Sequence, residues 1–224
     1  MARRLRHVLK DRLHTSQSCG IPGNSILEAA SLVRDAIAYS ETSGSPLCVI
    51  TLDFQHAFDR ISHHYLFQIL RRYGISEWFI EMLHVLYENA TASFQINGTL
   101  AVPIPIQSAV RQGCPLSMIL YVLCLHLFLR TLEDSLPGIR LGRSTWSPPV
   151  AAMVKDVTVL VTQPGDLAII HEAVRCYEKA TGAKLNSKTS KALPNGGGRS
   201  QHLNLELSLT TKLRYWGSNM EPPL

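Results

Sequence analysis

The chain has 224 residues, of which 46% are hydrophobic and 17% are charged, and its formal net charge is +5. This composition excludes an intrinsically disordered protein and predicts a globular chain with one sizeable core and room for a small appended lobe. The longest apolar run, 118–129, is too short to span a bilayer and no signal peptide is evident, so no membrane partner is expected.

Basic residues gather near the start of the chain and again after residue 174. Such clusters suit a polyanionic partner, although a solvated basic surface is the simpler explanation while nothing else points to nucleic acid. The five cysteines are scattered, without a Cys-x-x-Cys pair. We therefore expect buried thiols in a reducing intracellular compartment, the nucleus or the cytoplasm. The Arg-rich opening resembles a mitochondrial presequence, but it runs directly into globular-looking sequence.

The first predicted element is a helix that follows a Gly-Pro-rich loop at 20–23 and is capped by Asn24 or Ser25. Its apolar residues recur at helical spacing, at Ile26, Ala30, Val33 and Ile37. The run 47–52 then predicts a buried strand, which ends on the carboxylate of Asp53. Because burial of an unpaired carboxylate is costly, Asp53 must face a cation or a groove.

Two helices are expected next, one from Ser62 to a stop at Gly74 and one that begins after Ser76. The buried stripe of the second helix is predicted to consist of Trp78, Phe79, Met82, Leu83 and Leu86. Asn97-Gly98 predicts a two-residue hairpin, because these residues accept the positive φ angles of a type I′ turn.

A tight loop at 108–117 is predicted to open a long apolar helix that runs through Leu132. The runs 150–154 and 157–161 predict a second hairpin with Lys155 and Asp156 at its tip. Asp166 is expected to cap the next helix and Gly182 to end it. Residues 194–198 are interpreted as a linker, and strands are expected at 203–209 and 213–217.

A carboxylate at a strand end and another at a hairpin tip form the arrangement with which palm-type polymerases hold Mg²⁺. Four sequence motifs at 52–61, 111–117, 182–188 and 213–217 follow one another in the order known from one family. Over roughly residues 12–218, the chain resembles the reverse transcriptase domain of non-LTR (LINE-type, Tx1-like) retrotransposons. The motifs resemble, in turn, the first catalytic motif, the nucleotide-binding loop, the motif after the catalytic hairpin and the primer grip.

The resemblance implies an α+β fold: a right-hand polymerase palm with partial fingers, in which helices back an antiparallel sheet. It divides the chain into a lead-in with partial fingers (1–45), the palm (46–193), and a linker with the primer grip and the start of the thumb (194–224). The implied activity is RNA-directed DNA polymerisation. The implied partners are an RNA template, a DNA primer and deoxynucleoside triphosphates, with Mg²⁺ as the ancestral cofactor; the oligomeric state is not implied.

Carried over residue by residue, the resemblance implies that Asp53 and Asp156 are catalytic and bind the metal ions together with the carbonyl group of Phe54. The implied nucleotide-binding residues are Phe58, which would exclude a ribose 2′-hydroxyl, and Arg111, Gln112, Gly113 and Lys188. The implied primer grip consists of Tyr215, Trp216 and Gly217. Asp59 is interpreted as a structural acid or helix cap that points away from Asp53.

The chain departs from the family at Lys155, where the family carries the first of two adjacent acids. At about 4 Å, each like-charge contact costs about 4 kcal/mol at an effective dielectric constant near 20. We therefore expect Lys155 to pair with Asp53 or Asp156, to prevent metal binding and to impair the polymerase. We also expect a truncated domain, because most of the basic residues of the fingers would precede Met1 and the thumb would follow Leu224.

Two other hypotheses stay open at this point. Under the first, the chain is a noncatalytic module that uses a surviving basic groove to bind nucleic acid or a protein partner. Under the second, it is a remnant without a stable fold. The second follows from the apolar surface that the loss of fingers and thumb would expose.

Overall fold

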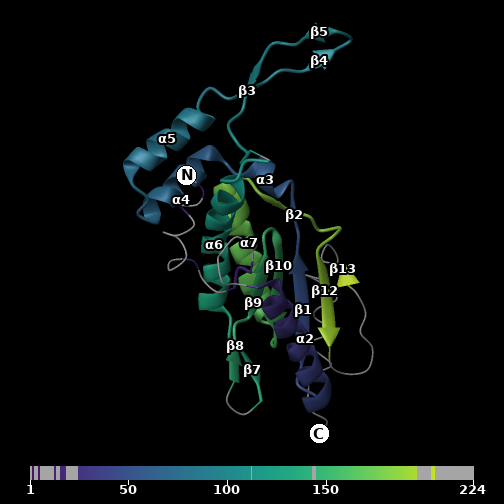
Figure 1. The fold of residues 1–224 in the computed structure, drawn as a ribbon. Helices are drawn as coiled ribbons and strands as arrows, with labels where there is room; N and C mark the ends of the chain where they lie inside the picture. The colour runs from purple at the N-terminus through teal and green to yellow at the C-terminus, as the bar shows by residue number, and fades with distance from the viewer. Residues whose placement is uncertain are drawn as a thin grey trace.

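The computed structural model describes residues 25–195 except 112, 143 and 144, together with residues 2, 5, 13, 16–18, 203 and 204. Its centre is an antiparallel five-stranded sheet with the order β13-β12-β1-β10-β9 (Figure 1). The strands are β1 (Leu47–Leu52), β9 (Val150–Met153), β10 (Asp156–Val161), β12 (Lys191–Asn195) and β13 (Leu203–Asn204). The predicted α+β class and the predicted strand after residue 46 are confirmed.

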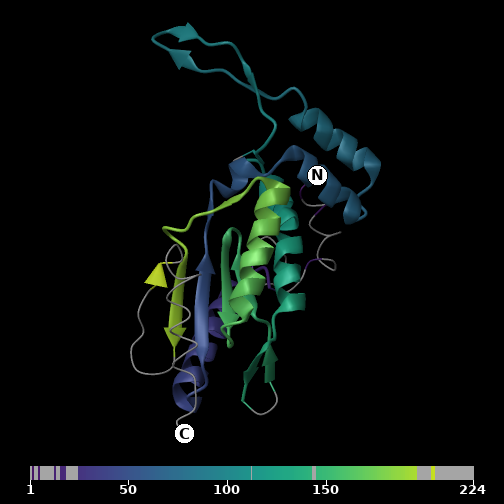
Figure 2. The ribbon, with the colours of Figure 1, turned by 180° about the vertical axis from the view of Figure 1, so that it is seen from behind.

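Both faces of β1 are apolar because helices cover both sides of the sheet. Cys48, Ile50 and Leu52 belong to the main core, which also contains the buried residues of α6 (Ser117–Ser135) and α7 (Asp166–Thr181). Leu47 and Val49 pack on the other side, in a smaller cluster with α2 (Ile26–Ser43). Figures 1 and 2 show α2 and the α6/α7 pair on opposite faces of the sheet. The sheet is therefore packed between helices on both of its faces.

Helix α2 begins as predicted, since the Oγ of Ser25 accepts a hydrogen bond from the N–H of Leu27 at 3.2 Å. Its inward face differs from the prediction in the first turns. Val33 and Ile37 pack on the sheet cluster, whereas Ile26 is 51% exposed and Ala30 is exposed as well. The residues of α2 that pack on this cluster all follow position 31, so the early apolar positions have nothing to cover them.

The cap of the helix after the predicted catalytic hairpin lies one residue earlier than predicted. Gly165 occupies the cap position of α7 and Asp166 is the first helical residue, so Asp166 is not the cap. Gly182 ends α7 in the left-handed conformation, with φ of 83°, as predicted. A Cβ atom at this position would lie 3.0 Å from the carbonyl oxygen of Arg60, so the close approach also requires glycine.

Three helices follow β1 and form a second layer at one end of the sheet: α3 (Ala57–Arg60), α4 (His63–Arg72) and α5 (Glu77–Tyr87). The predicted buried stripe of α5 is confirmed only in part: Leu83 is buried and Phe79 packs half-buried against the core, whereas Met82 is only half-buried and Trp78 and Leu86 are exposed. The buried residues are Ile80, Leu83 and Tyr87, and Trp78 is 64% exposed. Only the face of α5 that packs on α4 is covered, and sequence periodicity alone cannot select between two apolar faces.

A hairpin arm, residues 91–105, extends beyond this end of the molecule (Figures 1 and 2). It contains β3 (Thr91–Ala92) paired with β6 (Ile104–Pro105), and β4 (Gln95–Ile96) paired with β5 (Thr99–Leu100). Asn97 and Gly98 have φ angles of 49° and 81°, so the predicted type I′ turn is confirmed.

The short remaining pairs are β2 (Phe54–Gln55) with β11 (Lys184–Leu185), and β7 (Ile139–Leu141) with β8 (Thr145–Ser147). Pro194 and Asn195 complete β12 and pair with β1, so they do not begin a linker as predicted. Of the strand expected at 203–209, the structure describes Leu203–Asn204; residues 196–198, 205–209 and 213–217 lie outside the described residues.

No helix in the described part of the chain combines the length and the apolar character needed to cross a membrane.

Candidate active site

Strand pairing brings Asp53 and Asp156 to the same end of the sheet. Asp53 directly follows β1, and Leu52 at the end of β1 pairs with Val157 of β10. Asp156 is the first residue of β10 and pairs with Met153 across the hairpin turn. Two carboxylates that are far apart in the sequence therefore lie close together on the palm floor.

Lys155 occupies the turn of this hairpin and contacts both carboxylates. Its Nζ lies 2.6 Å from Oδ1 of Asp53 and 3.7 Å from Oδ1 of Asp156. The expected pairing of Lys155 with these acids is thereby confirmed. The turn itself is strained at Val154, whose φ is 54°. Gln17 holds it from the side, because its Oε1 accepts the N–H of Val154 and its Nε2 donates to the Val154 carbonyl.

The turn that follows β11 encloses Asp53 from the opposite side. The hydroxyl of Thr189 donates to Oδ2 of Asp53 at 2.5 Å, and the side-chain amide of Asn186 lies 3.4 Å from the same oxygen. The backbone is fixed as well, since the N–H of Asn186 donates to the Asp53 carbonyl and the N–H of Asp53 donates to Oγ of Ser190. Both carboxylate oxygens of Asp53 are therefore already hydrogen-bonded within the protein.

These contacts set the ionisation of the pair. Burial disfavours the charged form of Asp53, but the hydrogen bonds from Lys155, Thr189 and Asn186 and the charge of Lys155 outweigh it, so the pKa of Asp53 lies below its usual value of 3.8. The hydrogen bond to Asp53 likewise raises the pKa of Lys155 above 10.5. At neutral pH the two groups form a charged pair.

The residues present do not fit a divalent metal ion. Mg²⁺ needs several oxygen ligands at about 2.1 Å in octahedral geometry. Within the described residues no group of three or more His, Cys, Asp or Glu side chains could hold a metal ion. Around Asp53, an ammonium group takes the position next to Oδ1, and Oδ2 already accepts from Thr189. A metal ion at Oδ1 of Asp53 would have to displace the ammonium group of Lys155.

The aromatic residues of the first motif are part of the core. Phe54 is 1% exposed and makes edge contacts with the rings of Phe128 and Tyr177. Phe58 is half-buried and stacks on Tyr121, with ring centroids 4.7 Å apart. The carbonyl of Phe58 also accepts the N–H of Val110 at 2.8 Å, which fixes the 108–117 loop beside the segment that carries Asp53.

Arg111 connects this loop to α5. Its Nη2 donates to the Leu86 carbonyl at 2.7 Å, and its guanidinium lies 5.9 Å from the centroid of the Tyr87 ring. The carbonyl of Arg111 accepts from the hydroxyl of Ser117 at the start of α6. Gly113 adopts a positive φ of 81° in the same loop, while Gln112 lies outside the described residues.

The other predicted site residues make no described contact with the Asp53 side chain or lie outside the described residues. Lys188 is exposed on the turn between Asn186 and Thr189. The primer-grip residues Tyr215, Trp216 and Gly217 lie outside the described residues. Asp59 is in the first turn of α3, with Oδ2 3.9 Å from Nδ1 of His56.

Sequence reasoning missed the residues that enclose Asp53 from the side of β11: Asn186, Thr189 and Ser190. A run of short polar side chains directly after an expected strand was the available signal, because such side chains form local hydrogen bonds in turns.

A separate cavity of about 620 Å³ lies between α4, α5 and the base of the hairpin arm. His63, Phe67, His84 and Tyr87 contribute to its lining. None of the residues that contact the Asp53 side chain lines it, so it is distinct from the candidate active site.

The antiparallel sheet and its helical backing have the fold of a polymerase palm. Solved structures agree on the fold. The apo telomerase of Candida tropicalis without its C-terminal domain superimposes with a TM-score of 0.63 at 16% identity, over 90% of this chain and 41% of that one. A Candida albicans telomerase in complex with a TWJ fragment of telomeric RNA gives a TM-score of 0.61 at 13% identity, over 91% of this chain and 38% of that one.

Sequence comparison identifies the family. The family model for reverse transcriptase (RNA-dependent DNA polymerase) matches residues 1–218, so the chain belongs to this family. The transposon TX1 149 kDa protein of Xenopus laevis is 33% identical over 86% of this chain. The Pol polyprotein of the retrotransposable element R2DM of Drosophila melanogaster is 26% identical over 84% of it. The matched regions span 15% and 18% of those relatives, and together they identify a reverse transcriptase domain of the non-LTR type.

Proposed function

We propose that this chain is the palm of a non-LTR-type reverse transcriptase in which an internal ion pair has replaced the metal site, so that DNA synthesis is lost or strongly impaired. The observation that supports it is the 2.6 Å contact between Lys155 and Asp53. In two-metal polymerisation the metal ions stabilise the attacking and leaving oxygens, and the protein contributes the carboxylates that hold them. Here the ammonium group of Lys155 contacts both carboxylates and offsets one of their two negative charges.

The expected size of the effect follows from electrostatics. A like charge at about 4 Å costs a divalent ion about 4 kcal/mol or more at an effective dielectric constant near 20, which corresponds to about a thousandfold loss of affinity. The contacts of Thr189 and Asn186 add to this, since a metal ion would compete with them for Oδ2 of Asp53. We therefore expect the site to stay free of Mg²⁺ at millimolar concentrations.

The roles that the family resemblance implies for other residues of this chain are part of the same proposal. Phe58, held by its stack on Tyr121, would select deoxynucleotides by its bulk. Gly113 and Lys188 would lie near the nucleotide, and an RNA template with a DNA primer would cross the sheet. The telomerase of Candida albicans, which shares the fold, forms a complex with RNA, in accordance with this choice of partner.

Primer extension tests the proposal. The natural chain, the variant Lys155→Asp and the double variant Lys155→Asp/Asp53→Asn are incubated with a DNA primer on an RNA template, deoxynucleoside triphosphates, and Mg²⁺ or Mn²⁺. We expect extension by Lys155→Asp alone, since the double variant again lacks a metal ligand. Extension by the natural chain at the rate of Lys155→Asp would overturn the proposal. Inactivity of all three would show that Lys155 is not the only cause of the loss.

A second candidate is a noncatalytic nucleic-acid-binding module. It is favoured by exposed lysines close to the Asp53 end of the sheet, at Lys184, Lys188 and Lys191 on β11, the following turn and β12. Such a module would bind a primer–template duplex without extending it, and its affinity would fall as the salt concentration rises.

We also propose that the chain works inside the cell, in the nucleus or the cytoplasm. The described cysteines, Cys48, Cys114, Cys124 and Cys176, are all free thiols. Burial raises the pKa of Cys48 to about 12, so this thiol is unreactive and suits a reducing compartment.

A further inference from the structure

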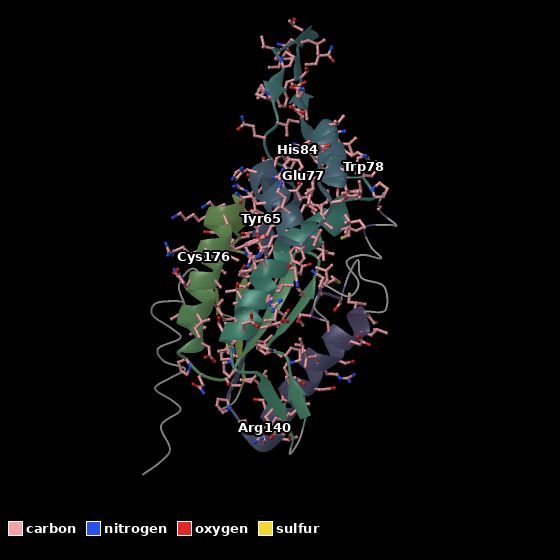
Figure 3. All side chains as sticks on the ribbon, turned by 90° about the vertical axis from the view of Figure 1, so that its left-hand side faces the viewer. Tyr65, Glu77, Trp78, His84, Arg140 and Cys176 are labelled. Atoms are coloured by element: carbon pink, nitrogen blue, oxygen red, sulfur yellow. The ribbon has the colours of Figure 1, made fainter. Side chains whose placement is uncertain are left out.

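Helix α5 is apolar on two opposite faces. One face is buried against the body of the protein through Ile80, Leu83 and Tyr87. The other carries Trp78, Val85 and Leu86, which are 64%, 76% and 40% exposed. Together with the half-buried Met82, these residues follow the spacing i, i+4, i+7, i+8 and form one stripe along the helix. Figure 3 shows Trp78 on the outer side of α5. We call these four residues the α5 outer stripe.

The α5 outer stripe is too apolar for a helix face that only meets water. Scattered apolar residues on a surface are normal, but a contiguous stripe on a helix marks an interaction surface. The hairpin arm next to it adds Phe94, Ile96 and Leu100, each more than half exposed. Trp78 and Val85 remain mainly exposed in the described part of the chain.

The charges around the stripe indicate the partner. At 100° per residue, Glu77, Glu81 and Glu88 lie in a row on one flank of the stripe. Glu77 already pairs with Arg71, whereas no ion pair of Glu81 or Glu88 is described within residues 25–195. From residue 73 to 110 the chain contains these three acids and no lysine or arginine, although its net charge is +5. This segment is therefore the acidic and apolar part of a basic protein.

This charge pattern disfavours two kinds of occupant. A nucleic-acid backbone would meet the carboxylates of Glu81 and Glu88, which is unfavourable. The arginines beside α5 are already engaged, Arg71 with Glu77 and Arg111 with the Leu86 carbonyl. A second copy that packs α5 against α5 would bring two rows of carboxylates together. An amphipathic helix with an apolar stripe and basic residues on its flank matches both the shape and the charge.

We propose that the outer face of α5 is a docking surface for a basic amphipathic helix of a protein partner. Trp78, Met82, Val85 and Leu86 would supply the apolar contact, and Glu81 and Glu88 would fix the orientation of the bound helix through charge. Neither the ion pair at Asp53 nor any metal ion contributes to this docking surface. The proposal is therefore independent of the proposed function.

Binding of a designed helical peptide tests the docking surface directly. The probe is a fluorescein-labelled peptide of about 18 residues, or five helical turns, with leucines at i, i+4, i+7 and lysines on one flank. A second peptide has glutamates in place of the lysines, and a third has the first composition in scrambled order. Fluorescence anisotropy measures the affinity of each peptide for the folded chain. We expect the basic helix to bind at least about tenfold more tightly than either control, a difference of about 1.4 kcal/mol.

Matched substitutions show where the peptide binds. Val85→Lys interrupts the stripe and Glu81→Lys/Glu88→Lys reverses its flank, and each is expected to weaken binding at least about tenfold. Leu27→Lys and Glu28→Lys/Glu41→Lys place the same changes at exposed positions of α2 and are expected to leave binding unchanged. All these positions are exposed, and circular dichroism melting verifies that each variant is folded.

Four results would overturn the proposal. The first is equal binding of the acidic and basic peptides, and the second is undiminished binding to Val85→Lys. The third is a dimer in sedimentation equilibrium that Val85→Lys abolishes and the basic peptide does not displace, because the occupant would then be a second copy of this chain. The fourth is binding of fluorescein-labelled oligouridylate to the folded chain that Val85→Lys abolishes, because the face would then belong to nucleic acid.

Discussion

The Nζ of Lys155 lies 2.6 Å from Oδ1 of Asp53, although 102 residues separate the two in the sequence. The contact exists because β1 and β10 are adjacent strands and the turn before β10 folds over the end of β1. It places an ammonium group beside the carboxylates of Asp53 and Asp156, where the proposed function requires that no divalent metal ion binds. The consequences can be measured in stability, ionisation and metal binding.

Replacement of Lys155 by methionine should destabilise the fold. The change keeps the length of the side chain but removes the cation between two carboxylates, so we expect a loss of about 1 kcal/mol in the free energy of unfolding, in the range of partly exposed ion pairs. Urea denaturation measures it. Lys191→Met, at an exposed position of β12, is the matched control and should change stability less. A Lys155→Met variant as stable as the natural chain would show that the pair contributes nothing.

Loss of the Thr189 hydroxyl should raise the pKa of Asp53. Thr189→Val keeps the shape of the side chain and removes the donor to Oδ2, a hydrogen bond to a charged group that is worth about 1.5 kcal/mol. Because the folded-state pKa of Asp53 is below 3.8, its contribution to stability is present above that pH and is lost as the pH falls through the folded-state pKa.

In Thr189→Val the loss of stability still begins near the unfolded-state pKa, but it should be smaller and should end at a higher pH, because the folded-state pKa of Asp53 is raised. Carbon-detected NMR of the Asp53 carboxyl group reports the shift, and Thr158→Val on β10 is the control. An unchanged titration of Asp53 would contradict the described contact.

The end of α7 should depend strongly on glycine. Gly182→Ala places a Cβ at φ of 83° and 3.0 Å from the Arg60 carbonyl, so we expect a loss of more than about 1 kcal/mol. Gly165→Ala is the matched control at the other end of the helix, where φ is −62° and no atom lies within 4 Å of the new Cβ. Thermal melting of both variants gives the comparison, and equal melting temperatures would contradict the geometry.

His63 should make the fold sensitive to mild acid. Burial lowers the pKa of His63 below 6.5, and the charges of Arg111 and His84 add to this, against the hydrogen bond to the Ala109 carbonyl. The unfolded chain therefore binds a proton at higher pH than the folded chain does. The free energy of unfolding should fall as the pH drops below 6.5, and the decrease should end below the folded-state pKa.

In His63→Gln this part of the pH dependence should disappear. Urea titrations at several pH values measure it, with His171→Gln at an exposed position of α7 as the control. The same slope below pH 6.5 in His63→Gln and the natural chain would assign the proton to another group.

The sequence was sufficient to predict the parts of the site that depend on strong local patterns. A continuous apolar run ending in Asp53 can hardly be other than a buried strand, and two such runs around Lys155 and Asp156 form a hairpin. The pairing of Lys155 with the acids followed from its charge together with the family resemblance, which implied that Asp53 and Asp156 converge. Asn97-Gly98 gave the turn of the hairpin arm because few residue pairs accept its φ angles.

The parts that could not be predicted depend on tertiary context. Helix α5 has two apolar faces, and only its packing on α4 decides that Ile80 rather than Trp78 is buried. The glycines after Pro194 predict a linker from the local sequence, yet Pro194 belongs to β12 because this strand pairs with β1. The hydrogen bond of Thr189 to Asp53 spans 136 residues, and no local pattern specifies such a contact.

Binding of Mn²⁺ tests the central claim most directly. The natural chain and Lys155→Asp are titrated with Mn²⁺, and electron paramagnetic resonance measures the free ion, with Lys191→Asp as a control for the added negative charge. If Lys155 excludes the metal, the natural chain and Lys191→Asp bind no Mn²⁺ at this site, and Lys155→Asp binds it about a thousandfold more tightly. Equal binding by the natural chain and Lys155→Asp, abolished in both by Asp53→Asn, would contradict the account.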